Sequence, residues 1–196
     1  MPGIVVIGAG PGVGRAVAAR FAKEGMPVAL IARTPKKDAV TFTADVADVH
    51  GLERALDQAV DAHGIPDVVV YNAAVIQPDG PATITADELT RTFQVNVGGA
   101  FTAAAHLAPR MKNGSFLLTG GMPHPVKGYL SLSIGKGALR TLTTLLAEEY
   151  DHLHVATITI GGDVVKGTKY DPDAIAEHYW QLHTQPKHQW ERERTL

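Results

Sequence analysis

The chain has 196 residues, of which 18 are Lys or Arg and 20 are Asp or Glu, so its formal net charge is -2. This balance excludes the basic stripe of a nucleic-acid-binding protein and a polybasic membrane patch. Hydrophobic residues make up 45% and charged residues 19%, which excludes a disordered chain. There is no cysteine, so disulfides and thiolate zinc sites are excluded as well.

The length predicts one domain, residues 1–196. The start of the chain lacks the basic stretch and apolar segment of a signal peptide. Its apolar runs have the length of strands and are too short to span a membrane. We therefore expect a cytoplasmic protein that binds neither membranes nor nucleic acid.

Apolar, β-branched runs alternate with helical patterns along the chain. One of the predicted helices, which starts at residue 85, is expected to bend near Gly98-Gly99 or Pro109. Thr85 and Asp171 are expected to cap helices. In chain order we predict a strand at 4–7, a helix at 15–22, strands at 28–32 and 41–43, a helix at 52–63, a strand at 68–71, a helix from 85 to about 111, a strand at 116–118, a helix at 131–150, a strand at 155–160, a helix at 172–183 and a seventh strand within 189–196.

The predicted strands are apolar throughout, which is typical of strands that are covered on both faces. Their alternation with helices predicts an α/β fold with a Rossmann-type, doubly wound parallel sheet and helices on both faces. Right-handed crossovers place the carboxyl ends of all strands at one edge of such a sheet. A ligand is expected to bind along that edge.

A glycine-rich loop joins the first strand to the first helix. Gly8, Gly10, Gly12 and Gly14 allow backbone amides to approach a diphosphate, Val13 belongs to the same loop, and the amino terminus of the helix that follows favours negative charge. The alternative interpretation is a tight strand-to-helix turn without a ligand. A strand before the loop, a helix after it and its place near the start of the chain favour a dinucleotide site.

The spacing Gly8-x-x-x-Gly12-x-Gly14 resembles the short-chain dehydrogenase/reductase family, and the resemblance extends from residue 3 to about 168. It implies that the cofactor is also bordered by residues after the third, fourth and sixth strands. It further implies that Asn96 positions a water, that Lys136 holds the nicotinamide ribose, and that the helices from 85 and 131 form a homodimer or homotetramer. After the third strand, Asp45-Val46 is implied to meet the adenine. Asn72-Ala73 is the cofactor motif after the fourth strand, and Val164, after the sixth, is implied to contact the nicotinamide amide.

The end of the second strand predicts which nicotinamide cofactor is preferred. NAD-specific sites carry an acidic residue there, which accepts a hydrogen bond from the ribose hydroxyl. This chain has Arg33-Thr34 instead, and a guanidinium binds a 2′-phosphate. We therefore expect NADP(H) to be preferred over NAD(H). The alternative is a solvated arginine at a strand end.

The catalytic centre departs from the family pattern, which has a Tyr four residues before the Lys and a Ser at the end of the fifth strand. Leu132 stands at the Tyr position, and Gly120-Gly121 stand at the Ser position. Asn96 and Lys136 remain. Tyr129, seven residues before Lys136, is a candidate replacement acid if it lies in the loop before the helix. The alternatives are a Tyr129 packed on the surface and a role for His124 in the preceding loop.

Two functional hypotheses follow. The first is an NADP(H)-dependent oxidoreductase that acts on a small carbonyl or alcohol substrate with a non-standard proton relay. The alternative is a catalytically inactive NADP(H)-binding protein, such as a sensor or an assembly partner. The histidines have no paired ligand spacing, so no metal site is predicted. The family's long substrate-covering insertion before the last helix is absent, which predicts an open pocket.

Overall fold

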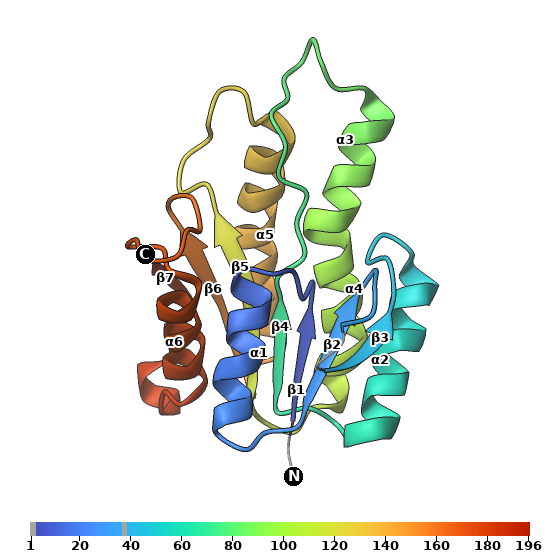
Figure 1. Cartoon of the computed structure of the whole chain (residues 1–196), viewed down its shortest axis with the longest axis vertical. Coiled ribbons are helices and arrows are strands. Elements are labelled where there is room, and N and C mark those ends of the chain that lie inside the picture. The colour runs from blue at the N-terminus through green and yellow to red at the C-terminus, as the bar shows by residue number, and fades with distance from the viewer. Residues whose placement is uncertain (1–2, 37–38) are drawn as a thin grey trace.

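The computed structural model describes residues 3–36 and 39–196. Within these ranges the chain forms a parallel, seven-stranded sheet in the order β3-β2-β1-β4-β5-β6-β7 (Figure 1). The strands are β1 (Ile4–Ile7), β2 (Val28–Ala32), β3 (Val40–Thr43), β4 (Val68–Tyr71), β5 (Ser115–Gly121), β6 (His154–Ile160) and β7 (Glu193–Thr195).

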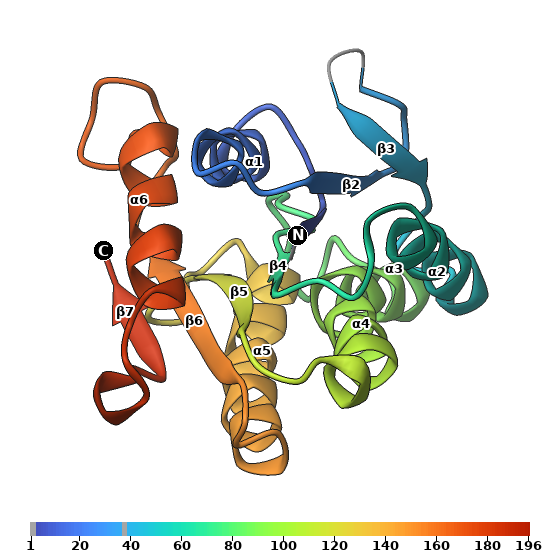
Figure 2. The same ribbon diagram turned by 90° about the horizontal axis from the view of Figure 1, so that it is seen from below.

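Helices cover both faces of the sheet (Figure 2). On one face, α1 and α6 pack over a core that contains Val6, Phe21 and Tyr179. On the other face, α2, α4 and α5 pack over a core that contains Leu56, Leu107 and Leu139. The helices are α1 (Val13–Lys23), α2 (Val49–His63), α3 (Ala86–Phe93), α4 (Gly99–Leu107), α5 (Leu130–Glu149) and α6 (Pro172–His183), with short 3-10 turns at Ala108–Arg110 and Lys187–Gln189.

The predicted fold class is confirmed, and the largest difference from the expected strands lies in β5. That strand extends beyond 118 because residues 119–121 keep their pairing with Ile158, Thr159 and Ile160 of β6. The expected seventh strand is present as β7, parallel to β6. Helix α1 begins at Val13, two residues earlier than predicted.

The segment after Thr85 is not one continuous helix. Thr85 and Glu88 form a capping box at the start of α3, as predicted. The helix then widens into a π-helical turn, η1 (Gln94–Gly98), before it continues as α4. The position of the expected bend, Gly98-Gly99, is where this π turn passes into α4. π turns insert one extra residue and occur frequently at functional sites.

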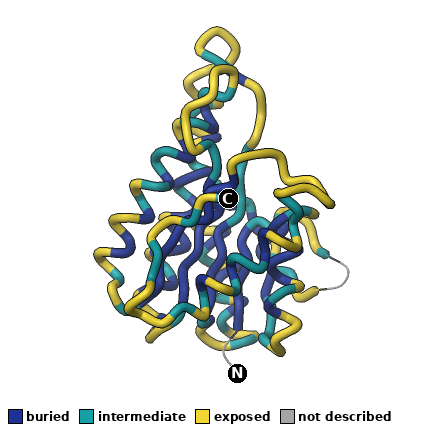
Figure 3. The backbone as a smooth tube through the Cα atoms, turned by 90° about the vertical axis from the view of Figure 1, so that its left-hand side faces the viewer, coloured by how far each residue is buried: buried dark blue, intermediate teal, exposed yellow. Residues whose placement is uncertain are grey.

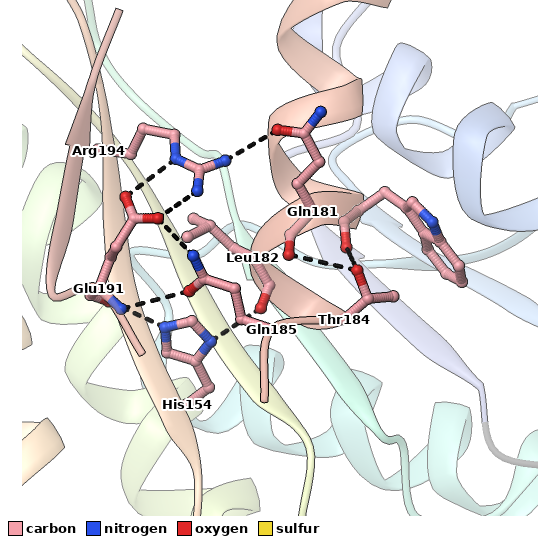
Figure 4. A network of polar contacts seen from close by, with 8 residues as sticks. His154, Gln181, Leu182, Thr184, Gln185, Glu191 and Arg194 are labelled. Atoms are coloured by element: carbon pink, nitrogen blue, oxygen red, sulfur yellow. Dashed lines mark hydrogen bonds and ion pairs between the residues drawn. The ribbon is translucent and has the colours of Figure 1, made fainter. Parts of the chain in front are cut away.

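A polar network holds the carboxyl-terminal segment against β6 and α6 (Figure 4). The two ring nitrogens of buried His154 each lie 2.8 Å from a backbone oxygen, one of Leu182 and one of Glu191. The His154 ring also stacks on Trp190 with centroids 5.0 Å apart. Arg194 pairs with the Glu191 carboxylate. These contacts attach β7 to the edge of the sheet.

The carboxyl ends of the strands carry the most exposed loops, which extend beyond the buried core of the sheet (Figure 3). Two of them, after β4 and after β5, meet where Asp79 and Tyr129 form an isolated parallel bridge. The buried Asp79 carboxylate accepts hydrogen bonds from the backbone and hydroxyl of Ser131 at the start of α5. Asp79 thereby ties the β4 loop to the first turn of α5.

Candidate functional site

A cavity of about 1200 Å³ opens at the carboxyl edge of the sheet. It is lined by the segments that follow each strand from β1 to β6, and it extends from the glycine loop to the buried end of Lys136. This is the edge at which the sequence predicted ligand binding. Doubly wound sheets bind ligands in the crevice outside the carboxyl ends of their strands.

Two glycines of the loop are required by close packing. Gly8 has φ +87°, and a Cβ there would lie 2.4 Å from the backbone nitrogen of Ala73. A Cβ on Gly14 would lie 2.7 Å from the Gly8 carbonyl oxygen. A side chain at either position would separate the loop from β4 or from α1.

The other two glycines leave space for a ligand. A Cβ on Gly10 would meet no atom within 4 Å, and one on Gly12 would meet only Val164 Cγ1 at 3.9 Å. Both positions line the cavity, so a side chain at either one would occupy it. Gly12 is also the N-cap of α1, whose first turn has no side-chain cap and no acidic residue. Its amide groups, starting with Val13, fit a diphosphate.

A cationic cluster borders the cavity at the end of β2. Arg33 and Thr34 both line it, as predicted. The Arg33 side chain is exposed and makes no hydrogen bond or ion pair with another described residue. Lys36 also lines the cavity, and its Nζ lies 3.3 Å from Thr34 Oγ1. Two cations and a hydroxyl at this position fit a phosphate group.

Beyond this cluster, Asp45 and Val46 line the cavity after β3. Asp45 Oδ1 accepts a hydrogen bond from the backbone of Ala47 at 3.0 Å, and Oδ2 lies 3.2 Å from a guanidinium nitrogen of Arg91 on α3. Both carboxylate oxygens of Asp45 therefore have partners. Because Asp45 and Arg91 neutralise each other's charge, they do not form a second anion-binding site in the cavity.

Asn72 links the glycine loop to the end of β5. Its amide nitrogen donates to the Gly8 carbonyl at 2.8 Å, and its oxygen accepts from the Thr119 hydroxyl at 2.9 Å. Thr119 also lies 2.7 Å from the buried Tyr179 hydroxyl on α6. The Thr119 hydroxyl is thus held on the α6 face of the sheet and does not replace the missing Ser. Asn72 and Ala73 both line the cavity.

Asn96 lies in the π turn and is completely buried. Its oxygen accepts from the Val75 amide at 2.8 Å, and its amide nitrogen donates to the Val75 carbonyl at 3.4 Å. A Cβ on Gly135 of α5 would lie 2.9 Å from Asn96 Cβ, so this glycine allows α5 to approach the turn closely. The Asn96 side chain therefore fixes the backbone around the site, and it does not itself line the cavity.

Lys136 extends from α5 into the cavity and is only 5% exposed. Its Nζ donates to the Thr119 carbonyl oxygen at 2.6 Å. Burial disfavours the ammonium and lowers the pKa of Lys136 from 10.5 to about 8. A cationic group beside the β5 end fits the ribose-binding role that the family resemblance implies.

The two positions at which the family resemblance implies a Tyr and a Ser lie next to this lysine. Leu132 lines the cavity one helical turn before Lys136 and is 4% exposed. A Cβ on Gly121 would lie 3.8 Å from Lys136 Cε and 3.6 Å from the Ile160 carbonyl, which are ordinary contacts. On Gly120 it would lie 2.5 Å from Thr157 Cγ2. Gly121 is therefore the position at which a serine would face the site.

Tyr129 lies directly before α5, as its candidate role required, but its side chain is not among the residues that line the cavity. Its backbone is used in the bridge to Asp79 and in a hydrogen bond to the Val126 carbonyl. His124 does line the cavity, in an exposed part of the loop after β5. The structure therefore does not bring Tyr129 together with Asn96 and Lys136.

Val164 closes the other side of the cavity, opposite Gly12. It lies in residues 161–171, which connect β6 to α6 without a helix or strand. A Cβ on Gly162 would lie 2.4 Å from Tyr170, and one on Gly161 would lie 3.0 Å from the Tyr170 hydroxyl. These two glycines are therefore explained by the Tyr170 ring that packs over them.

Two charged residues that line the cavity, Lys36 and Arg91, were not predicted from the sequence. Lys36 belongs to a basic stretch that starts at Arg33, so charge clustering was an available signal. Arg91 reaches Asp45 across 46 positions of the sequence, and no local pattern indicates that contact. Among the described residues no helix is long and apolar enough to cross a membrane, and no cluster of His, Asp and Glu is arranged to hold a metal ion.

Comparisons with known proteins agree with this geometry. A family model described as short chain dehydrogenase matches residues 3–177. A versicolorin reductase of Emericella nidulans is 30% identical over 161 residues, which cover 73% of this chain and 61% of the fungal protein. A versicolorin reductase 1 of Dothistroma septosporum is 26% identical, with 89% and 73% covered. A short-chain dehydrogenase/reductase structure from Serratia marcescens is 27% identical with a TM-score of 0.86, covering 100% of this chain and 95% of that one.

Proposed function

The chain belongs to the short-chain dehydrogenase family, and we propose that it is an NADP(H)-dependent oxidoreductase that acts on a small carbonyl compound or alcohol. One observation carries this proposal: a single cavity connects the uncapped helix start at Gly12, the cations after β2 and the buried amine of Lys136. These three features match the diphosphate, the 2′-phosphate and the nicotinamide ribose of one dinucleotide.

Different residues hold different parts of this cofactor. Amides at the start of α1 hold the diphosphate, Arg33 and Lys36 hold the 2′-phosphate, and Lys136 holds the nicotinamide end near Val164. When bound, the nicotinamide supplies or accepts a hydride. At that end the cavity is lined by exposed apolar side chains, with Ile76 71% and Val126 44% exposed. This lining favours an apolar carbonyl substrate.

The cofactor preference is tested by titrating NADPH and NADH into the protein and following nucleotide fluorescence. Wild type is expected to bind NADPH more tightly. Arg33→Asp should weaken NADPH binding about tenfold to hundredfold, because hydrogen bonds to charged groups contribute about 1.5–3 kcal/mol. Arg54→Asp, at an exposed position of α2 outside the cavity, is the matched control for the charge change. Equal wild-type affinities for the two nucleotides would contradict the proposal.

A catalytically inactive NADP(H)-binding protein is the second candidate, and Leu132 together with Gly121 favours it, because neither residue can transfer a proton. The two candidates are separated by cofactor oxidation with a panel of small aldehydes and ketones. Turnover supports the oxidoreductase. Tight NADPH binding without turnover on the whole panel supports the binding protein.

We also propose a homodimer or homotetramer built on α4 and α5. Phe101 on α4 is 56% exposed, and Leu145 on α5 is 58% exposed, although both are large apolar residues. Phe93 and Ile134 add further exposed apolar surface on α3 and α5. Light scattering at micromolar concentration should report an oligomer that Phe101→Glu with Leu145→Glu dissociates. A monomeric wild type would refute this.

A further inference from the structure

Lys136 is isolated from other charges in an otherwise apolar environment. Its Nζ has one hydrogen-bond partner, the Thr119 carbonyl, and no carboxylate of the described residues lies within ion-pair distance. The nearest basic group on its own helix is Arg140, one turn later. That side chain turns away to the Met122 carbonyl at 2.6 Å and to Glu193 at 3.3 Å.

The strands and the π turn packed against α5 contribute no titratable side chain at this end of the site. The β5 strand has none, the π turn Gln94–Gly98 has none, and the only one of β6, His154, lies at the opposite end of that strand. Helices α3 and α4 also contact α5, but Asp87, Glu88 and Arg91 of α3 are exposed, and His106 of α4 pairs with Asp57. The other titratable side chains that line the cavity are at the nucleotide end or in exposed loops. They are Arg33, Lys36, Asp45, Arg91, His124 and Asp163.

The two positions from which the family supplies a hydroxyl leave the amine unshielded. Leu132 offers only methyl groups, and Gly121 has no side chain between the strand end and Lys136 Cε. In the proposed function the substrate carbonyl would lie at this end of the cavity. Lys136 Nζ carries exchangeable protons here, whereas the buried Thr119 hydroxyl is bonded to Asn72 and lies beside the Tyr179 hydroxyl.

We propose that Lys136 is itself the acid that protonates the carbonyl oxygen, and the base in the reverse direction. This inference rests on the proposed oxidoreductase function. In reduction, an N–H bond of the ammonium breaks and an O–H bond forms, while the carbonyl carbon gains the hydride that the reduced nicotinamide supplies. The C=O bond becomes a single bond, the nicotinamide is oxidised, and the neutral amine recovers a proton from water that enters the open cavity.

The chemical state of Lys136 suits this role. Because burial lowers its pKa to about 8, the amine is mostly protonated at pH 7 and still releases its proton much more readily than an exposed lysine. A general acid is most effective when its pKa lies near the working pH. The bond to the Thr119 carbonyl holds Nζ at the end of β5, where the proton is needed.

The decisive variant is Lys136→Arg, because a guanidinium keeps the positive charge and the donors but does not release a proton at working pH. We expect NADPH affinity to change less than about tenfold and kcat to fall about 10²- to 10⁴-fold, the usual contribution of a positioned acid. Lys112→Arg, at an exposed site beyond the opposite edge of the sheet, is the matched control. Retained kcat in Lys136→Arg would overturn the inference and leave the proposed function standing.

The pH profile and a direct titration complete the test. In wild type, kcat/KM for reduction should decline above about pH 8, and for alcohol oxidation it should rise toward that pH. Protein labelled with 13C at lysine Cε should show one resonance with a midpoint near 8 in an NMR titration, and this resonance should be missing in Lys136→Arg. A flat profile, or a midpoint near 10.5, would overturn the inference. Absence of all turnover with intact NADPH binding would instead refute the proposed function, and the inference with it.

Discussion

The buried amine of Lys136 should lower the stability of the fold, and Lys136→Met should reveal by how much. The pKa falls from 10.5 in the unfolded chain to about 8 in the folded protein. At about 1.4 kcal/mol for each tenfold change in proton affinity, this corresponds to about 3 kcal/mol of destabilisation at neutral pH. Met fills a similar volume without the charge, but the Thr119 carbonyl loses a hydrogen bond worth about 1 kcal/mol. We expect Met to stabilise the protein by about 2 kcal/mol at pH 7.

The sign of the pH dependence follows from the direction of the shift. Between pH 8 and 10.5 the unfolded chain binds more protons at Lys136 than the folded protein does. Wild-type stability therefore gains from this group as pH rises through that window, and below about pH 8 its penalty is constant. The advantage of Met should accordingly shrink as pH rises from 7 toward 10.

Urea unfolding of wild type and Lys136→Met at pH 7 and pH 9.5, followed by far-ultraviolet circular dichroism, measures both quantities. Lys112→Met serves as the control for loss of a lysine at an exposed position. A Met variant that is no more stable than wild type at pH 7, with a difference that does not change by pH 9.5, would refute the reasoning.

Four further changes test other parts of the molecule. Tyr129→Phe should alter steady-state turnover by less than about threefold, because a phenol outside the cavity transfers no proton to the substrate; a large loss would contradict the observed placement. The double variant Gly121→Ser with Leu132→Tyr should raise kcat for carbonyl reduction about tenfold or more by adding a positioned hydroxyl acid. Gly120→Ser should instead lower the free energy of unfolding by about 2 kcal/mol, because its side chain would contact Thr157. Thr85→Ala should lower stability in urea by about 1 kcal/mol through loss of the capping box.

Local pattern was sufficient for most of the fold. The Thr85 and Asp171 caps depend on contacts with residues nearby in the sequence. The strands and the parallel sheet depend on apolar runs being buried, whichever residues cover them. The end of β5 was missed because Gly120-Gly121 have low strand propensity, and pairing with β6 overrides that propensity.

The residues of the site also differ in whether the local sequence predicts their position. The glycine loop and Arg33 follow strand ends directly, so their place at the cavity was predictable from the sequence. The distinction between Gly120 and Gly121 depends on which atoms of β6 and α5 face each one, and the sequence contains no such information. For Tyr129 the sequence left open whether it lies in the loop or in the helix, and the structure places it directly before α5, where the loop pairs with Asp79, 50 positions away.

The short connection between β6 and α6 has a kinetic consequence. Residues 161–171 form neither a helix nor a strand that would have to swing aside before product leaves. In many enzymes the opening of a lid before product release limits the overall rate and masks the chemical step. For the reaction proposed here, deuterium at the transferred position of NADPH should therefore slow steady-state turnover by nearly its full intrinsic isotope effect, and added viscogen should have little influence.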